Sequence, residues 1–236
     1  MGPSVIVGAP APTHDLIRLR EPTALATNGQ VPSWVEAALR RAPWVVVRRG
    51  RIQAGGIPVG LRGLTRAQRF AAWLAAADVA ERRSPEELWD GAENRPAPGL
   101  AGAPERTRTV AVPALAALAR VAPLLALRGY RWGPAGSVGF ELATGVATAT
   151  ASSDLDVILR QAQRLELDEA RALQAALAEA AAPARIDTLL ETPRGGVALA
   201  DLAAAPTRVL VRTPDGPYLA TDPWAADAGA WMEGVS

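Results

Sequence analysis

The feature that most restricts the fold is residues 153–159, where acidic and apolar side chains alternate at the start. Asp154 and Asp156 are two positions apart, separated by Leu155 and followed by Val157. Side chains two apart on a β-strand project to the same face. The run therefore predicts a strand with two carboxylates on one face. Such close carboxylates repel each other unless a cation lies between them, so the strand either holds a cation or lies at a solvent-exposed edge.

The residue types that are missing narrow the chemistry. The chain has no Cys and no Lys, and its single histidine is His14. Thiol nucleophiles, thiolate zinc sites, Walker-type lysines, Schiff bases and paired-histidine metal sites are therefore excluded. Carboxylates, arginines and hydroxyls are left, and these groups suit oxygen-liganded cations such as Mg²⁺ and the phosphates bound to them.

Length and charge limit the organisation and the partners. The 236 residues fit one large domain or two small ones. The formal net charge of +1 gives no global basic excess, so no nucleic-acid partner is expected. Apolar runs are shorter than the roughly 20 residues needed to span a bilayer. A cytoplasmic protein without a membrane partner is expected.

Local patterns predict the elements of the first half. Ser33 is a suitable cap for a helix over residues 33–41. Runs rich in β-forming residues predict strands over 44–49 and 57–61. The spacing of Phe70, Trp73 and Val79 predicts a helix over 65–83 that begins at Thr65. Residues 93–108 are rich in Pro, Gly and Arg without periodicity, and they predict a linker between domains at 1–92 and 109–236.

The second half alternates helical and strand patterns. A helix is expected over 115–127, with a break or kink at Pro123, and a second one over 168–181. Strands are expected over 153–159 and 185–190, and a terminal hairpin pairs 209–213 with 218–220. The fold class is α+β: a small N-terminal α/β domain followed by a domain with a mixed sheet flanked by helices.

Two further features give the aspartate pair a context. Gly136-Ser137 lies upstream, and a Gly-Ser turn entering a helix offers N–H groups and a hydroxyl to a phosphate. Asp187 lies downstream in an otherwise apolar strand, where a partner such as a cation or Arg185 is expected. The three features together are more specific than any one of them.

Arginines must supply every cationic side-chain contact to a polyphosphate, because the chain lacks Lys. Several arginines cluster in the first half around the ends of the expected strands. Most surface arginines only keep a domain soluble, but this cluster lies beside strand ends and glycines that allow a ligand to approach closely. The candidates for substrate contact are Arg48, Arg49, Arg62 and Arg66.

The second half resembles the DNA polymerase β-type nucleotidyltransferase superfamily. The resemblance assigns Gly136 and Ser137 to the phosphate-binding turn, and it assigns the metal-binding and catalytic carboxylates to Asp154, Asp156 and Asp187. It implies a polymerase β-like domain and two Mg²⁺ ions. The stretch between Ser137 and Asp154 is longer than is usual there, so Ser152 and Ser153 are also candidates for part of the phosphate contact.

A narrower resemblance covers nearly the whole chain. The motifs that carry it are Thr13-His14-Asp15-Leu16, Val45-Val46-Val47-Arg48-Arg49, Ile57-Pro58-Val59-Gly60-Leu61-Arg62-Gly63, Trp132-Gly133-Pro134-Ala135-Gly136-Ser137, Glu141-Leu142-Ala143-Thr144-Gly145 and Ser152-Ser153-Asp154-Leu155-Asp156. They are similar to the malonate decarboxylase holo-acyl-carrier-protein synthases, or phosphoribosyl-dephospho-CoA transferases. That family transfers a prosthetic group from triphosphoribosyl-dephospho-CoA to a serine of the apo acyl carrier subunit of malonate decarboxylase, and pyrophosphate leaves.

Two other functions are compatible with the same residues. One is a different nucleotidyltransferase that adenylylates a protein or a small molecule. The other is a non-catalytic carrier-binding module with the same fold. His14 precedes Asp15 as in the family, but a lone histidine at such a position is more often a cap or surface residue, and it is left outside the expected chemistry.

Overall fold

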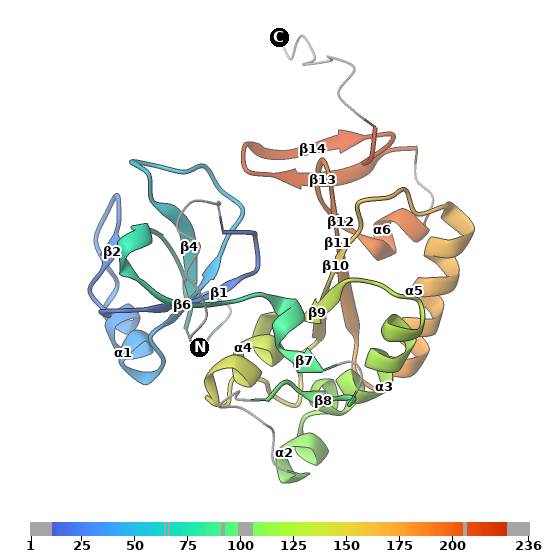
Figure 1. Cartoon of the computed structure of the whole chain (residues 1–236), viewed down its shortest axis with the longest axis horizontal. Helices are drawn as coiled ribbons and strands as arrows, with labels where there is room; N and C mark the ends of the chain where they lie inside the picture. Colours follow the sequence, from blue (N-terminus) through green and yellow to red (C-terminus); the bar gives the residue numbers. More distant parts are fainter. Residues whose placement is uncertain are drawn as a thin grey trace.

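A computed structural model describes residues 11–63, 65, 67–90, 93–98, 106–204 and 207–225. Two six-stranded sheets dominate these residues, one in each half of the chain (Figure 1). Helices pack on both, so the expected α+β class is confirmed. None of the helices in the described part of the chain is both long and apolar enough to cross a bilayer.

The sheet of the N-terminal half is antiparallel, with the strand order β2-β5-β4-β3-β1-β6. One helix, α1, occupies the residues that the sequence predicts for it, 33–41. The elements are β1 (Leu16–Leu19), β2 (Leu25–Ala26), α1 (Ser33–Arg41), β3 (Trp44–Val47), β4 (Ile57–Arg62), β5 (Arg69–Leu74), the 3-10 turn η1 (Ala76–Asp78) and β6 (Val79–Arg83).

The helix predicted for residues 65–83 is wrong. The described residues of this segment form β5, η1 and β6. β5 pairs with β4 over six positions, and Ala72 and Leu74 are fully buried, two positions apart as on a strand. Alanine-rich sequence favours a helix in isolation, but pairing with a buried strand outweighs that preference of a few tenths of a kcal/mol per residue.

Alternation along β1 and β3 gives this sheet two buried faces. Ile17 and Val45 belong to a core that includes Val35 of α1. Their neighbours Leu16 and Trp44 point the other way and join the core of the C-terminal half. The two halves therefore share apolar contacts.

The segment between the two six-stranded sheets contains secondary structure of its own. It contains η2 (Pro85–Glu87), β7 (Trp89–Asp90), β8 (Arg95–Pro96) and α2 (Arg106–Ala111). β8 pairs with β7 and α2 begins at Arg106, so the described residues of the predicted linker 93–108 include a short strand and the start of a helix. The division into domains at 1–92 and 109–236 stays a prediction.

The sheet of the C-terminal half is mixed. Its order is β14-β13-β12-β11-β10-β9; β10 and β11 are parallel and the other pairs are antiparallel. The strands are β9 (Trp132–Pro134), β10 (Leu155–Arg160), β11 (Ile186–Thr192), β12 (Gly195–Ala198), β13 (Val209–Thr213) and β14 (Gly216–Ala220). The predicted strands and the terminal hairpin are thus confirmed.

Four helices accompany this sheet: α3 (Pro113–Leu127), α4 (Gly136–Thr144), α5 (Leu167–Ala181) and α6 (Leu199–Ala203). Of the break or kink expected at Pro123, the break is wrong, because α3 continues through this residue. Pro123 is exposed while Val121, Ala122 and Leu125 are fully buried. Packing of the apolar face therefore offsets the roughly 3 kcal/mol that an interior proline costs.

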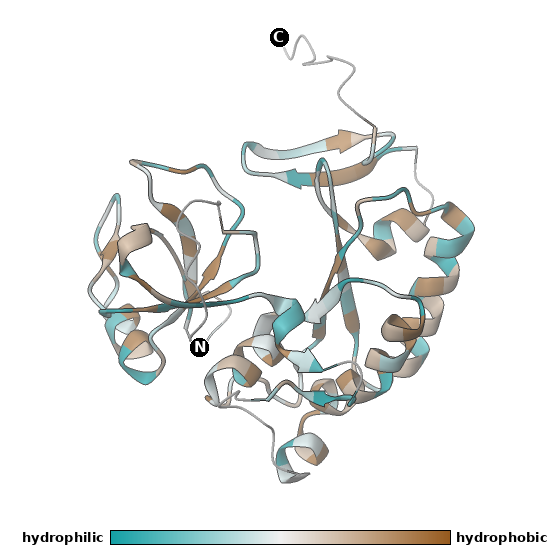
Figure 2. Ribbon diagram, in the orientation of Figure 1, coloured by the Kyte–Doolittle hydropathy of each residue, from teal (hydrophilic) through white to brown (hydrophobic). Residues whose placement is uncertain are grey.

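Each face of this sheet has a different neighbour. Leu155, Val157 and Leu159 share one core with Leu118 of α3 and Leu173 of α5. Figure 1 shows these helices on one side of the sheet and the N-terminal half on the other, and Figure 2 shows hydrophobic segments on the strands and on α3 and α5. Alternation places Asp156, Arg160, Asp187 and Glu191 on the face away from the helices.

Candidate active site

Asp156 and Asp187 are direct neighbours on this open face. They are partners in the parallel register of β10 and β11, so their Cα atoms are about 4.8 Å apart. Asp187 is exposed rather than buried in an apolar strand, which corrects the environment inferred from its sequence neighbours. An open hollow of about 430 Å³ lies against Arg185 and Asp187. A ligand can therefore reach the carboxylate of Asp187.

Asp154 lies just before β10 and is held by Arg185. The guanidinium donates from Nε to Oδ1 at 2.9 Å and from the terminal nitrogen to Oδ2 at 2.6 Å. The hydrogen bond to Asp154 and then the negative charges of Asp154 and Asp187 raise the pKa of Arg185. Arg185 is one of the partners expected for Asp187. Its hydrogen bonds go to Asp154 instead, and its interaction with Asp187 is through charge.

The carboxylate of Asp156 has a perturbed pKa. Burial, then the charges of Asp187 and Asp154, raise its pKa from 3.8 to about 6, against smaller opposing effects of Arg62 and His14. A carboxyl that is buried beside two other negative charges is stabilised by an added cation. Arg62 and His14 both belong to the N-terminal half, so that half contributes positive charge to this site.

Gly136 lies against Asp156. Its φ is +57°, and a Cβ at this position would be 1.8 Å from Oδ2 of Asp156. The peptide N–H of Ala135 also donates to the carbonyl of Asp156 at 2.9 Å. The Gly136-Ser137 turn, at the start of α4, and the aspartates are thus brought together. Only glycine fits here, for its conformation and for its lack of a side chain.

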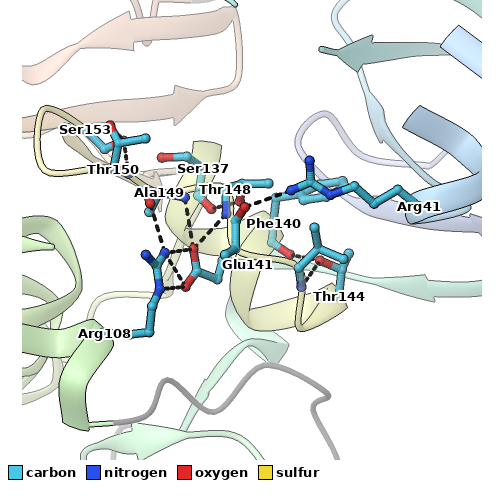
Figure 3. A network of polar contacts seen from close by, with 12 residues as sticks. Arg41, Arg108, Ser137, Phe140, Glu141, Thr144, Thr148, Ala149, Thr150 and Ser153 are labelled. Carbon is cyan, nitrogen blue, oxygen red and sulfur yellow. Dashed lines mark hydrogen bonds and ion pairs between the residues drawn. The ribbon is translucent and has the colours of Figure 1, made fainter. Parts of the chain in front are cut away.

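The segment between α4 and Asp154 is held by Glu141. This carboxylate is 4% exposed and accepts hydrogen bonds from the N–H groups of Thr148 and Ala149, both at 2.9 Å, and from Arg108 of α2 (Figure 3). Thr148 in turn donates its hydroxyl to the carbonyl of Ser137 at 2.8 Å. The sequence offered one signal for this role: a glutamate inside an otherwise apolar helical stretch.

Ser153 closes the tight turn before Asp154. Its hydroxyl accepts a hydrogen bond from the N–H of Thr150 at 2.9 Å, and its own N–H donates to the carbonyl of Thr150 at 3.0 Å. The Ser153 side chain is thereby engaged in the turn, close to the aspartates in sequence. Ser152 is exposed beside it, and its hydroxyl is 3.2 Å from that of Thr150.

The four candidate arginines have different surroundings. Arg62, at the end of β4, is exposed and acts electrostatically on Asp156. Arg48 lies over the ring of Trp73 at 5.4 Å, within the N-terminal half. Arg49 forms an ion pair with Glu191 and is only 15% exposed, so its guanidinium has a protein partner. Arg66 lies outside the described residues. Arg62 is thus the described candidate that the structure brings to the aspartates.

His14 is a site residue that sequence reasoning left out. Its ring donates to Glu191 at 3.1 Å, and its charge acts on Asp156. Its φ of +77° is in the left-handed region, where a non-glycine residue needs support from its surroundings. No local sequence pattern predicts this conformation, in which the His14 N–H donates to the carbonyl of Val47 at 2.8 Å.

No three carboxylate or imidazole groups among the described residues are already gathered around one point as metal ligands. The residues nevertheless fit a hard divalent cation. Asp154, Asp156 and Asp187 supply only oxygen ligands, and Asp156 is destabilised by the negative charges of the other two. Binding an ion requires Asp154 to share or exchange its contact with Arg185.

Comparisons with known proteins agree along most of the chain. A model of the Phosphoribosyl-dephospho-CoA transferase MdcG N-terminal domain matches residues 12–85, and one of the corresponding C-terminal domain matches residues 100–223. No solved structure matches the chain.

Curated relatives cover the chain nearly end to end. A phosphoribosyl-dephospho-CoA transferase of Pseudomonas putida is 41% identical over 93% of this chain and 97% of the relative. The protein of the same name from Pseudomonas aeruginosa is 40% identical over 89% and 92%, and that from Azotobacter vinelandii is 41% identical over 84% and 87%. The chain therefore belongs to the phosphoribosyl-dephospho-CoA transferase family.

Proposed function

We propose that this transferase moves the phosphoribosyl-dephospho-CoA group from triphosphoribosyl-dephospho-CoA to a serine hydroxyl of the apo acyl carrier subunit of malonate decarboxylase, and that pyrophosphate leaves. The observation that carries the proposal is the pairing of Asp156 with Asp187 on the open sheet face, beside the bare Cα of Gly136 and with Asp154 close enough for its charge to act on Asp156. Family membership supplies the donor class, and the resemblance to polymerase β-type nucleotidyltransferases supplies the reaction type.

Asp154, Asp156 and Asp187 would hold the metal, proposed to be two Mg²⁺ ions. When bound, such ions favour ionisation of the acceptor hydroxyl and stabilise the charge of the leaving pyrophosphate. The raised pKa of Asp156 supports this assignment, since the carboxylate is buried beside two like charges. Arg185 fixes the orientation of Asp154 through both of its oxygens.

The other residues orient the donor and the acceptor. Arg62 supplies positive charge to the donor's polyphosphate from the N-terminal half. Gly136 leaves room for the carboxylate of Asp156 at the start of α4. The N–H groups of this helix N-terminus are proposed to contact a phosphate of the donor. Ser137 and Ser153 are proposed to contribute to the same phosphate contact.

The reaction is an in-line displacement at phosphorus. The acceptor oxygen bonds to the phosphorus that is attached to the ribose, and the bond from that phosphorus to pyrophosphate breaks. Asp187 is exposed and lines the hollow at the start of β11, and it is proposed to take the proton of the acceptor hydroxyl.

The test is Asp154→Ala, with transfer of the prosthetic group to the apo carrier measured by intact mass. Transfer should be abolished while the fold persists, because the partner left behind, Arg185, is exposed. Asp168→Ala is the matched control, since Asp168 is 99% exposed on α5 and should retain full activity. Full transfer by Asp154→Ala would refute the proposal.

Two experiments separate the alternatives. An adenylylating enzyme would release pyrophosphate with ATP, whereas the proposed enzyme releases it with triphosphoribosyl-dephospho-CoA and the apo carrier. A non-catalytic carrier-binding module would show no binding of Mn²⁺ or Mg²⁺ by calorimetry, with or without saturating donor.

A further inference from the structure

The His14-Asp15 pair has no part in the chemistry proposed above, yet it lies against the catalytic sheet. The contacts are made to Arg160 and Glu191, which are register partners on β10 and β11. Two consecutive residues of the N-terminal half thus engage two neighbouring strands of the C-terminal half. These four residues, together with Arg49, are called the interface ion cluster below.

One side of the interface ion cluster is centred on Glu191. Nε2 of His14 donates to Oε1 of Glu191 at 3.1 Å, and Arg49 donates to the same oxygen. Burial alone would raise the pKa of Glu191, but the hydrogen bonds from His14 and Arg49 outweigh it and lower the pKa. Both donors come from the N-terminal half, so one carboxylate of β11 binds that half at two points.

Gly196 makes room for Arg49. This glycine lies on β12, beside Glu191 in the sheet register. A Cβ at position 196 would be 2.6 Å from a terminal nitrogen of Arg49, closer than real contacts allow. The approach of Arg49 to Glu191 therefore depends on the absence of a side chain at this position.

The other side of the interface ion cluster has the opposite polarity. Asp15 is completely buried, and its carboxylate forms ion pairs with Arg160 at 3.6 Å and with Arg82 at 3.3 Å. Arg160 also donates to Glu86 at 2.8 Å. Two hydrogen-bond donors, His14 and Arg49, thus face Glu191 while the carboxylate of Asp15 faces Arg160, so only one alignment of the two halves satisfies both.

This alignment determines what faces the aspartates. Arg160 and Glu191 are four residues beyond Asp156 and Asp187 on the same face, a separation of about 13 Å along the strands. Apolar contacts of Leu16 and Trp44 join the halves as well, but they are non-directional. The directional contacts of the interface ion cluster fix the orientation in which Arg62 acts on Asp156.

We propose that the interface ion cluster positions the N-terminal half over the catalytic sheet, so that Arg62 meets the donor's polyphosphate. His14 is a positioning residue in this proposal and takes no part in proton transfer. The proposal rests on the proposed function for the identity of the donor.

The kinetic test compares His14→Gln with His14→Ala. The amide nitrogen of Gln can donate to Glu191 in place of Nε2, but an amide cannot serve as a base. We expect His14→Ala to raise the KM for triphosphoribosyl-dephospho-CoA by about tenfold, the size expected for a lost charge-assisted hydrogen bond, with a smaller change in kcat. His14→Gln should stay within about threefold of the wild type.

Two further variants complete the set. Gly196→Ala obstructs Arg49 without changing any charged group, and it should raise the donor KM as His14→Ala does. Glu36→Gln removes an exposed ion pair inside the N-terminal half and should leave the donor KM unchanged.

Equal loss of kcat in His14→Gln and His14→Ala would overturn the positioning role, since it indicates acid-base chemistry. An unchanged donor KM in His14→Ala and Gly196→Ala, with only a lower Tm, would overturn it too.

A distance measurement tests the same proposal without catalysis. The chain has no Cys, so Ala37→Cys and Asp201→Cys provide one labelling site in each half for energy transfer between dyes. His14→Ala and Gly196→Ala should broaden the distance distribution, and His14→Gln should not. Unchanged distributions in all variants would overturn the proposal even if Asp154→Ala abolishes transfer. Broadened distributions in a protein that transfers nothing would support the positioning role and refute the proposed function alone.

Discussion

At the scale of single residues, burial has an electrostatic cost at two aspartates, Asp156 and Asp15, because it raises the pKa of each. Asp156 is destabilised by burial and by two neighbouring carboxylates, and Asp15 is completely buried between the halves. The sequence indicated the first, because the alternation of Asp154, Leu155 and Asp156 defines a face. It did not indicate the second, because Asp15 precedes a short strand whose packing depends on Arg160, far away in the chain.

Asp15→Asn tests that cost through its pH dependence. Burial raises the pKa of Asp15 from 3.8 to about 6, against the attraction of Arg82 and Arg160. A raised pKa means that the folded state binds more protons than the unfolded state between these values, so the wild type loses stability as the pH rises through that window. Relative to Asp15→Asn, the free energy of unfolding of the wild type should fall by up to about 3 kcal/mol between about pH 4 and about pH 7.

Urea unfolding with a chelator present, at several pH values, measures this difference. Glu36→Gln is the control, because its exposed ion pair should give a difference from the wild type that is nearly independent of pH. A difference between the wild type and Asp15→Asn that stays constant with pH would show that Asp15 titrates normally.

At the scale of elements, local sequence patterns predicted correctly those helices and hairpins that are formed by residues close together in the chain. α1 lies at the predicted residues, and the β13–β14 hairpin lies where turn residues predicted it. The helix prediction for residues 65–83 was wrong because the alanines of this segment favour a helix. Its pairing with β4 is a long-range interaction, which local composition does not reveal. The contacts of Arg48 and Arg49 could not be predicted from the sequence either, since they are made with Trp73 and Glu191, which are distant in the chain.

The connection between α4 and β10 depends on one carboxylate. Glu141→Ala would leave the N–H groups of Thr148 and Ala149, and the guanidinium of Arg108, without their acceptor. We expect a loss of about 2–4 kcal/mol in the free energy of unfolding. Glu141→Gln keeps an oxygen for the two N–H groups and should lose less. Chemical denaturation measures both, and a loss below about 1 kcal/mol in Glu141→Ala would contradict this role.

At the scale of the whole molecule, the halves form one structure through a shared apolar core and the interface ion cluster. The sequence predicted two parts and the acidic site of the second. It did not predict how the first part approaches that site, because this depends on complementary shape and charge between segments more than a hundred residues apart.

A bound divalent ion should stabilise the whole molecule through the aspartates. Mn²⁺ at about one hundred times its Kd should raise the Tm of the wild type by about 5–10 °C, because it binds only the folded state. Asp156→Asn should lose most of this shift in Tm. Asp168→Asn should keep it, because Asp168 is a fully exposed residue of α5. Differential scanning calorimetry provides the measurement, and equal shifts in the wild type and Asp156→Asn would argue against metal binding at this site.

The strand orders also have a consequence for how the chain folds. The C-terminal sheet follows the order of the chain from β9 to β14, so each strand can add to the one before it as it forms. In the N-terminal sheet, β1 lies between β3 and β6, and Leu16 pairs with Arg83 across 67 residues. Closing so long a loop has an entropic cost that slows folding. The C-terminal sheet can therefore form by pairing strands that are consecutive in the chain. The N-terminal sheet is complete only when β6, its last strand in the chain, pairs with β1.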